Sequence, residues 1–176
     1  MTEREIKLPF ASAAHARAAL ESAGASPHAA RRLQDDVLYD NGENLLWGQR
    51  SALRLRKDGD RAVLTFKGPV EPGLLKSREE IESGVESHEA IALMLARLGF
   101  RPWFRYQKYR EELRAPGVIA AIDETPAGVF VEIEGDEAAV IALAARLGRG
   151  PSDFMLDSYR GVWLKTKGAE AGDMVF

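Results

Sequence analysis

Several segments of this chain place a charged residue at every second position, with apolar residues between them. Residues 5–8 (Glu-Ile-Lys-Leu) and 53–56 (Leu-Arg-Leu-Arg) show the pattern most clearly. Successive side chains of a β-strand point to opposite faces, so the alternation gives each strand one charged face and one apolar face. We therefore predict strands over residues 2–10, 31–40, 51–57, 61–67, 75–83, 103–113, 118–123 and 129–134.

Three further segments repeat apolar residues at the spacing of an amphipathic helix. We predict helices over residues 12–23, 87–98 and 136–147, with Ser87 and Asp136 as N-caps of the last two. Each segment is followed by a glycine, which most easily adopts the left-handed conformation found after a helix. These helices are the elements available to cover the apolar faces of the strands.

Composition limits the domain organisation and the classes of function. The chain has 176 residues and no linker, so we predict one α+β domain over 1–176, with its core in about 2–165 and a frayed tail at 168–176. The absence of cysteine excludes disulfides, thiolate nucleophiles and cysteine-ligated zinc. The net charge of −3 gives no general attraction to nucleic acid or to an anionic membrane, so neither is an expected partner.

Location and assembly follow less directly from the residues. The N-terminal residues do not resemble a signal peptide, and no apolar run has the length needed to cross a bilayer. We therefore expect a cytoplasmic protein. A homodimer is an open alternative to a monomer.

The charged faces admit two interpretations. One is a sheet whose charged side simply lies in water. Against it, Glu-x-Glu and Arg-x-Arg place like charges on one face of one strand, where they repel each other unless counterions intervene. If the sheet instead closes with the helices outside, the charged faces line a cavity, and a barrel of about eight strands can hold one small ligand. We favour this closed or nearly closed barrel.

The charges that would line the cavity indicate its occupant. A dry interior filled with unpaired charges would be prohibitively unstable, so the cavity must hold water, ions and a polar ligand. Carboxylates suit a hard divalent cation such as Mg²⁺, and Lys and Arg suit phosphate oxygens. A polyphosphate that chelates a metal is the expected ligand. The residues on the charged faces are Glu3, Glu5, Lys7, Arg54, Arg56, Arg61, Thr65, Lys67, Arg78, Glu80, Glu82, Lys108, Arg110, Asp123, Glu132 and Glu134.

Taken together, these residues resemble the CYTH family, also called triphosphate tunnel metalloenzymes, which includes class IV adenylyl cyclases, thiamine triphosphatases and inorganic triphosphatases. The family's Glu-x-Glu-x-Lys motif is matched at 3–7, and the resemblance covers about residues 2–165. It implies an eight-stranded antiparallel barrel with a triphosphate in its tunnel. The chain departs from the family at 158–163, where Arg-Gly-Val-Trp follows Ser-Tyr in place of acidic and leucine residues. The other motifs match in the family's order at 53–56, 64–69, 78–82, 108–110, 122–123 and 130–134.

The resemblance also implies roles for individual residues, with Mg²⁺ or Mn²⁺ as the cofactor. Asp123 could alternatively form a turn, and Arg78 could pair structurally with a neighbouring glutamate. For the attack of water we name Lys67 as the candidate base, its pKa lowered by neighbouring cations and assisted by Tyr39, for which core packing is an equal alternative. The expected metal ligands are Glu3, Glu5, Glu80, Glu82, Asp123, Glu132 and Glu134, and the expected triphosphate ligands are Lys7, Arg54, Arg56, Lys67, Arg78, Lys108 and Arg110.

Three functions fit these residues. We favour metal-dependent hydrolysis of a small triphosphate (inorganic triphosphate, thiamine triphosphate or ATP), because no segment indicates an adenine pocket. The first alternative is a class IV adenylyl cyclase that makes cyclic AMP and pyrophosphate from ATP. The second is a polyphosphate-binding module without activity, which only a turnover measurement distinguishes from an enzyme.

Overall fold

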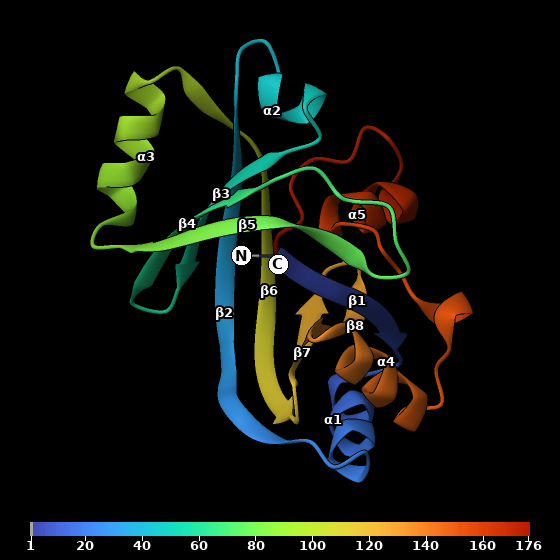
Figure 1. The fold of residues 1–176 in the computed structure, drawn as a ribbon. Helices are drawn as coiled ribbons and strands as arrows, with labels where there is room; N and C mark the ends of the chain where they lie inside the picture. The colour runs from blue at the N-terminus through green and yellow to red at the C-terminus, as the bar shows by residue number, and fades with distance from the viewer. Residues whose placement is uncertain (1) are drawn as a thin grey trace.

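The eight predicted strands form a closed antiparallel barrel in the computed structural model, which describes residues 2–176 (Figure 1). Around the barrel the order is β1-β5-β4-β3-β2-β6-β7-β8. The predicted barrel is therefore confirmed, although β2 begins five residues before the alternating pattern does, because this unpatterned stretch pairs with the end of β6. The strands are β1 (Thr2–Phe10), β2 (Ser26–Asn41), β3 (Ala52–Asp58), β4 (Arg61–Lys67), β5 (Lys76–Val85), β6 (Phe100–Ala115), β7 (Val118–Thr125) and β8 (Gly128–Gly135).

The three predicted helices are also confirmed, as α1 (Ala13–Ser22), α3 (His88–Arg97) and α4 (Glu137–Arg146). The Ser87 hydroxyl caps α3 by accepting a hydrogen bond from the Ala90 amide at 3.1 Å. At α4, Asp136 occupies the N-cap position as expected, but its side chain makes no capping hydrogen bond within the described chain. None of the helices in residues 2–176 combines the length and the apolar composition needed to span a membrane.

Two α-helices and one short turn of helix lie outside the sequence predictions. These are α2 (Leu45–Gly48), α5 (Tyr159–Lys167) and a 3₁₀ turn at Pro151–Asp153. The first and last are too short to show helical periodicity. In α5 the Ser158 side chain provides the N-cap, but Gly161 and a mixture of basic and aromatic residues obscure an apolar face.

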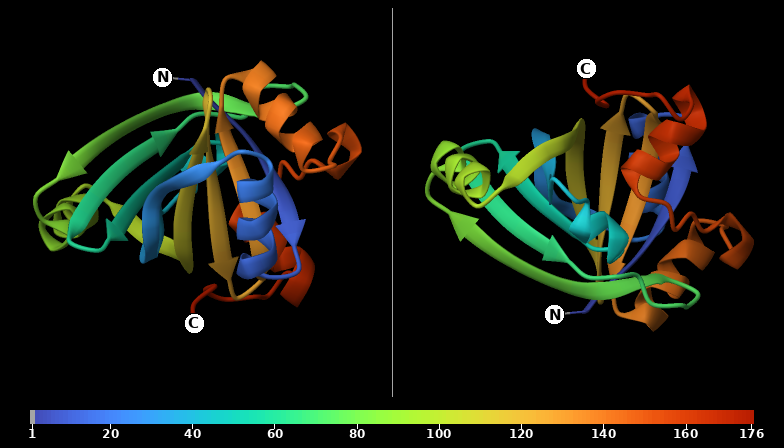
Figure 2. Two further views of the ribbon diagram at one scale, coloured as in Figure 1. Left: turned by 90° about the horizontal axis from the view of Figure 1, so that it is seen from below. Right: turned by 90° about the horizontal axis from the view of Figure 1, so that it is seen from above.

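The helices pack on the outer, apolar faces of the strands, which directs the charged faces inward. On one side of the barrel, Leu20 of α1 and Leu143 of α4 are fully buried in one cluster with Ile133 of β8. On the other side, Leu95 of α3 is buried against Leu55 of β3. Figure 2 shows this division, with α3 at one side of the barrel and α1, α4 and α5 at the other. The barrel interior is therefore left to the polar side chains.

The C-terminal segment completes the barrel at two strand edges. The pairing of β1 with β5 ends at Glu5, and beyond it Met155 exchanges two backbone hydrogen bonds with Lys7, of 2.9 and 3.1 Å. The pairing of β6 with β7 begins only at Tyr109, and the open edge before it is occupied by Met174, whose amide donates to the Arg105 carbonyl at 2.9 Å. Two free strand edges, which would otherwise expose backbone groups, are thus covered.

The end of the chain therefore differs from the frayed tail predicted at 168–176. Met174 is fully buried against Phe104, Tyr106 and Tyr159, and the Trp163 indole donates a hydrogen bond to the Gly172 carbonyl at 2.9 Å. The composition of the segment favours fraying, but the open edge of β6 and the apolar cluster beneath it provide a docking place that composition does not reveal.

We predict that Met174→Ala lowers the free energy of unfolding by about 2 kcal/mol or more, because truncation of a buried methionine leaves a cavity. The matched control is Val175→Ala, since the neighbouring Val175 is 37% exposed and should change stability by no more than about 0.5 kcal/mol. Chemical denaturation of both variants measures the difference. Equal stability of the two variants would show that the tail is not docked in solution.

Candidate functional site

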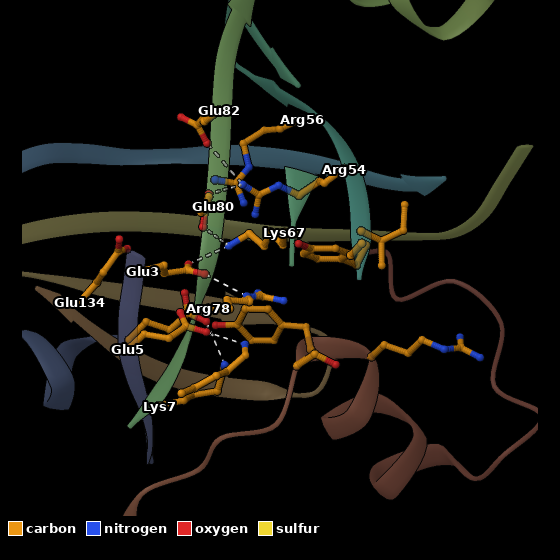
Figure 3. Close-up of a pocket in the computed structure, with 18 of the residues that line it drawn as sticks. Glu3, Glu5, Lys7, Arg54, Arg56, Lys67, Arg78, Glu80, Glu82 and Glu134 are labelled. Atoms are coloured by element: carbon orange, nitrogen blue, oxygen red, sulfur yellow. Dashed lines mark hydrogen bonds and ion pairs between the residues drawn. The ribbon is translucent and has the colours of Figure 1, made fainter. Parts of the chain in front are cut away.

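A cavity of about 650 Å³ occupies the barrel interior, and most of the predicted site residues line it (Figure 3). The structure brings together every residue given a role in the sequence analysis except Tyr39 and Asp123. The lining residues from that set are Glu3, Glu5, Lys7, Arg54, Arg56, Lys67, Arg78, Glu80, Glu82, Lys108, Arg110, Glu132 and Glu134.

Three carboxylates on β1 and β8 gather on one side of the cavity. Figure 3 shows Glu3, Glu5 and Glu134 there, away from Arg54 and Arg56. Glu5 and Glu134 are direct partners in the register of β1 with β8, a position in which like charges repel. Burial, together with the charges of Glu3 and Glu5, raises the pKa of Glu134 to about 7. Negative charge is therefore in excess at this point.

These carboxylates fit a divalent cation in donor type, since Mg²⁺ and Mn²⁺ prefer carboxylate oxygens. Glu134 makes no ion pair or hydrogen bond with any residue from 2 to 176. Glu3 contacts Lys67 at 2.7 Å, and Glu5 contacts Lys76 at 2.5 Å. With the lysines in these positions, no three acidic side chains in residues 2–176 converge as a finished metal site. The repulsion between Glu5 and Glu134 is what a cation would relieve.

Glu132 and Asp123 have a different environment, because they are surrounded by cations. Glu132 pairs with Lys7 at 2.9 Å and with Arg110, and although burial opposes ionisation, Lys7, Lys108 and Arg110 hold its pKa well below the usual range. Asp123 lies behind the lining, fully buried, and accepts from Lys108 at 2.9 Å and from the Arg110 Nε at 2.7 Å. Both carboxylates were expected as metal ligands, but in this structure they hold lysine and arginine side chains in position.

Asp36 performs the same task for the two arginines of β3. It is fully buried, and its carboxylate accepts two hydrogen bonds from Arg56, at 2.7 and 3.1 Å. Burial favours the neutral acid, but Arg56 and Arg54 together hold the pKa of Asp36 at about 2. The sequence analysis missed this residue because Asp35 and Asp36 are adjacent, so each face of β2 receives one carboxylate and the alternation is hidden.

One donor of Arg54 has no hydrogen-bond partner within the described chain. Its Nη2 donates to the Thr65 hydroxyl at 3.1 Å, whereas its buried Nε has no hydrogen-bond partner among residues 2–176 and lies 3.6 Å from the nearer Asp36 oxygen. A buried, unsatisfied guanidinium donor is costly, and an anion in the cavity would satisfy it. This is the structural evidence for an anion on this side.

The lysines differ from the sequence expectation in their neighbours. Lys67 was expected beside cations, but its ammonium contacts the carboxylates of Glu3 at 2.7 Å and Glu80 at 2.6 Å. Burial, and then the charge of the adjacent Arg110, lowers the pKa of Lys108 to about 8, and burial also lowers the pKa of Lys76. Lys67 thus connects the acidic and basic sides of the cavity.

Tyr39 does not reach the site, which corrects its predicted role as an assistant of Lys67. Its side chain is on the outer face of β2, buried with Leu55 and Leu95 beneath α3. The residue of β2 that lines the cavity at this level is Leu38. Counting in steps of two from Asp36 places Leu38 on the inner face and Tyr39 on the outer face. The sequence of β2 did not show this alternation clearly.

Other lining residues were missed for two reasons. Lys76 and Tyr106 each extend a recognised charged face by one more step of two, so the period itself could have found them. Ser158, Tyr159 and Arg160 come from the first turn of α5, which no strand alternation marks. The Tyr159 hydroxyl donates to Asp123 at 2.5 Å, and its ring faces Lys7 and Lys108 at 4.5 and 4.9 Å.

Comparison with known proteins gives a family match and several similar folds. The CYTH domain model matches residues 1–146. A Methanocaldococcus jannaschii protein provisionally named an adenylate cyclase is 30% identical over 105 residues, which cover 59% of this chain and 60% of that protein. The chain thus aligns with less than two thirds of that relative.

Solved structures with the same fold have lower sequence identity. PH1012 from Pyrococcus horikoshii OT3 is 22% identical, with a TM-score of 0.77 over 89% of this chain and 96% of that chain. HpAC1 from Hippeastrum, described as an adenylyl cyclase candidate with a dominant triphosphatase activity, is 18% identical, with a TM-score of 0.66 over 93% of this chain and 95% of that chain. At these identities the likeness establishes the fold alone.

We predict that Asp36→Asn lowers the free energy of unfolding at pH 7 by about 3 kcal/mol, because it leaves two buried arginines without their carboxylate. A folded pKa of about 2 lies below the ordinary aspartate value of about 3.9, so Asp36 stabilises the fold above that value and loses this contribution as the pH falls. The wild type should therefore lose stability more steeply than the variant between about pH 4 and pH 2.

The control for this prediction is Asp35→Asn, since Asp35 pairs with Arg105 on the partly exposed outer face and should contribute about 1 kcal/mol or less. Denaturation curves over the acidic range measure all three proteins. Parallel curves for the wild type and Asp36→Asn would contradict the assigned ion pair.

Proposed function

Since the chain belongs to the CYTH family, we propose that it is a divalent-metal-dependent enzyme that hydrolyses a small triphosphate bound in the barrel cavity. The observation that carries the proposal is the polarity of this cavity. On the side of β1 and β8, Glu134 has no ion pair within the described chain and lies opposite Glu5, and on β3 the Arg54 Nε has no hydrogen-bond partner there. A metal–triphosphate complex has the complementary polarity.

The chain's own residues account for binding of the phosphoryl groups. Arg54 and Arg56 are held by Asp36 with donors available to phosphoryl oxygens, and Arg can bind such oxygens in pairs. Lys7 and Lys108 are held by Glu132 and supply further positive charge. Because these cations are fixed before substrate arrives, little reorganisation is needed as charge develops.

The metal and the attacking water belong to the other side of the cavity. Glu3, Glu5 and Glu134 would hold Mg²⁺ or Mn²⁺, which when bound neutralises phosphoryl charge. Lys67 lies between Glu3 and Glu80, at the boundary of the two sides. From this place it is our candidate for orienting the water or the phosphoryl oxygen next to it, without the help of Tyr39.

The alternative reaction is cyclisation of ATP, which the name of the Methanocaldococcus jannaschii relative favours. Cyclisation requires the ribose 3′-hydroxyl to be held in line with the α-phosphorus, and therefore a nucleoside pocket. The triphosphatase activity described for the Hippeastrum protein favours hydrolysis. We favour hydrolysis because the phosphoryl-binding residues account for it without a further site.

We predict that inorganic triphosphate with Mg²⁺ or Mn²⁺ is cleaved more efficiently than thiamine triphosphate or ATP, with orthophosphate as a product. Steady-state assays with chromatography of the products test this. Cyclic AMP and pyrophosphate as the main products from ATP would establish the cyclase alternative. Tight binding of all three compounds without turnover would indicate a polyphosphate-binding module.

We also predict that Glu134→Gln raises the Mg²⁺ concentration needed for half-maximal activity by at least about tenfold. Without ligand the variant should melt at or above the wild-type temperature, because Glu134 makes no ion pair within the described chain and the change removes its repulsion of Glu3 and Glu5. Glu170→Gln, at an exposed position outside the cavity, is the control. An unchanged metal requirement in Glu134→Gln would contradict the proposed cation position.

A further inference from the structure

Tyr106 of β6 lies on the same side of the cavity as Arg54. Tyr106 lines the cavity and is directly opposite Asp36 in the register of β2 with β6. Its hydroxyl interacts with the Arg54 guanidinium, which lies close enough to donate a hydrogen bond to it. Tyr106 is thus part of the group of side chains proposed to bind phosphoryl oxygens.

The chemistry of this hydrogen bond determines where the phenolic proton goes. A guanidinium has donors only, so the Tyr106 oxygen is the acceptor and its own O–H remains a donor. No acceptor for that O–H is found among residues 2–176. Tyr159 differs, because its hydroxyl already donates to Asp123 at 2.5 Å. The free donor of Tyr106 lies in the cavity wall, where a phosphoryl oxygen is the expected acceptor.

Packing keeps the Tyr106 ring in place. The ring is stacked on Phe104 with centroids 5.8 Å apart, and the Tyr159 ring lies 6.0 Å away. Met174 is buried in the same cluster. Burial and the nearby charge of Asp36 raise the pKa of Tyr106, so the phenol keeps its proton at neutral pH.

We propose that Tyr106 is a substrate-binding residue that accepts a hydrogen bond from Arg54 and donates its own proton, in a hydrogen bond, to a phosphoryl oxygen of the triphosphate. The proposal rests on the proposed function and adds a specific ligand to it. It also assigns a tyrosine to the site in place of Tyr39, which is on the outer face of the barrel.

The test is calorimetric binding of inorganic triphosphate, with Mg²⁺ present, to the full chain and to Tyr106→Phe. Loss of a hydrogen bond to a charged group should weaken binding about tenfold or more. The matched control is Tyr109→Phe on the outer face of the same strand, where the ring packs on Arg31 at 3.7 Å, and binding should be unchanged. Without ligand, Tyr109→Phe should melt at the wild-type temperature, whereas Tyr106→Phe should melt somewhat lower, because it removes an acceptor of the buried Arg54.

A double-mutant cycle tests whether Arg54 orients the phenol. In the Arg54→Lys background, Tyr106→Phe should weaken binding by a smaller factor than in the wild type, because the hydroxyl has already lost its fixed orientation. If Tyr106→Phe does not fold, 3-fluorotyrosine placed at position 106 provides a second measurement. Its fluorine resonance should shift on addition of triphosphate, while a label at position 109 should not respond.

Each outcome decides the proposal. Wild-type affinity in Tyr106→Phe, an equal loss in Tyr109→Phe, or a silent fluorine label at position 106 would overturn the role of Tyr106 while leaving the proposed function in place. If the wild type itself binds none of the triphosphates, the proposed function fails, and the role of Tyr106 fails with it.

Discussion

The pairing of opposite charges across neighbouring strands is the interaction on which this barrel depends. A buried charge without a partner would cost several kcal/mol, and the interior holds many charges. Asp36 offsets Arg54 and Arg56 from the adjacent strand. Glu132 does the same for Lys7 on the adjacent β1, and it also pairs with Arg110 on β6, one strand further away. The interior can therefore be wet and charged without preventing the sheet from closing.

The pairing is incomplete, and the groups that it leaves without a partner differ between the two sides of the cavity. On β1 and β8 the charge is negative, because Glu5 and Glu134 face each other. On β3 the charge of Arg54 is paired with Asp36, but its Nε has no hydrogen-bond acceptor within the described chain. A ligand gains binding energy from groups that have no partner within the fold. Some interior charges therefore stabilise the barrel, and others are available to bind a ligand.

Much of this arrangement could be predicted from the sequence, because a strand's period of two is a local property. Residues such as Glu3, Arg56 and Lys108 follow from it, as do the barrel and the helices outside it. Tyr39 was placed wrongly because adjacent aspartates disguised the phase of β2. The environment of Lys67 depends on which strands become neighbours, and the docking of Met174 depends on an edge left open by β7. Neither is encoded within a few residues.

The segment after residue 146 lies beyond the matched family domain, yet it contributes part of the cavity wall through Tyr159 and Arg160. It is attached to the barrel along two strand edges, at Met155 and Met174, and crosses between them as α5. One side of the binding chamber is thus built by a segment outside the barrel strands. Substitutions in this segment would change the shape of the chamber and leave the eight strands in place, so it is a suitable region in which to alter substrate preference.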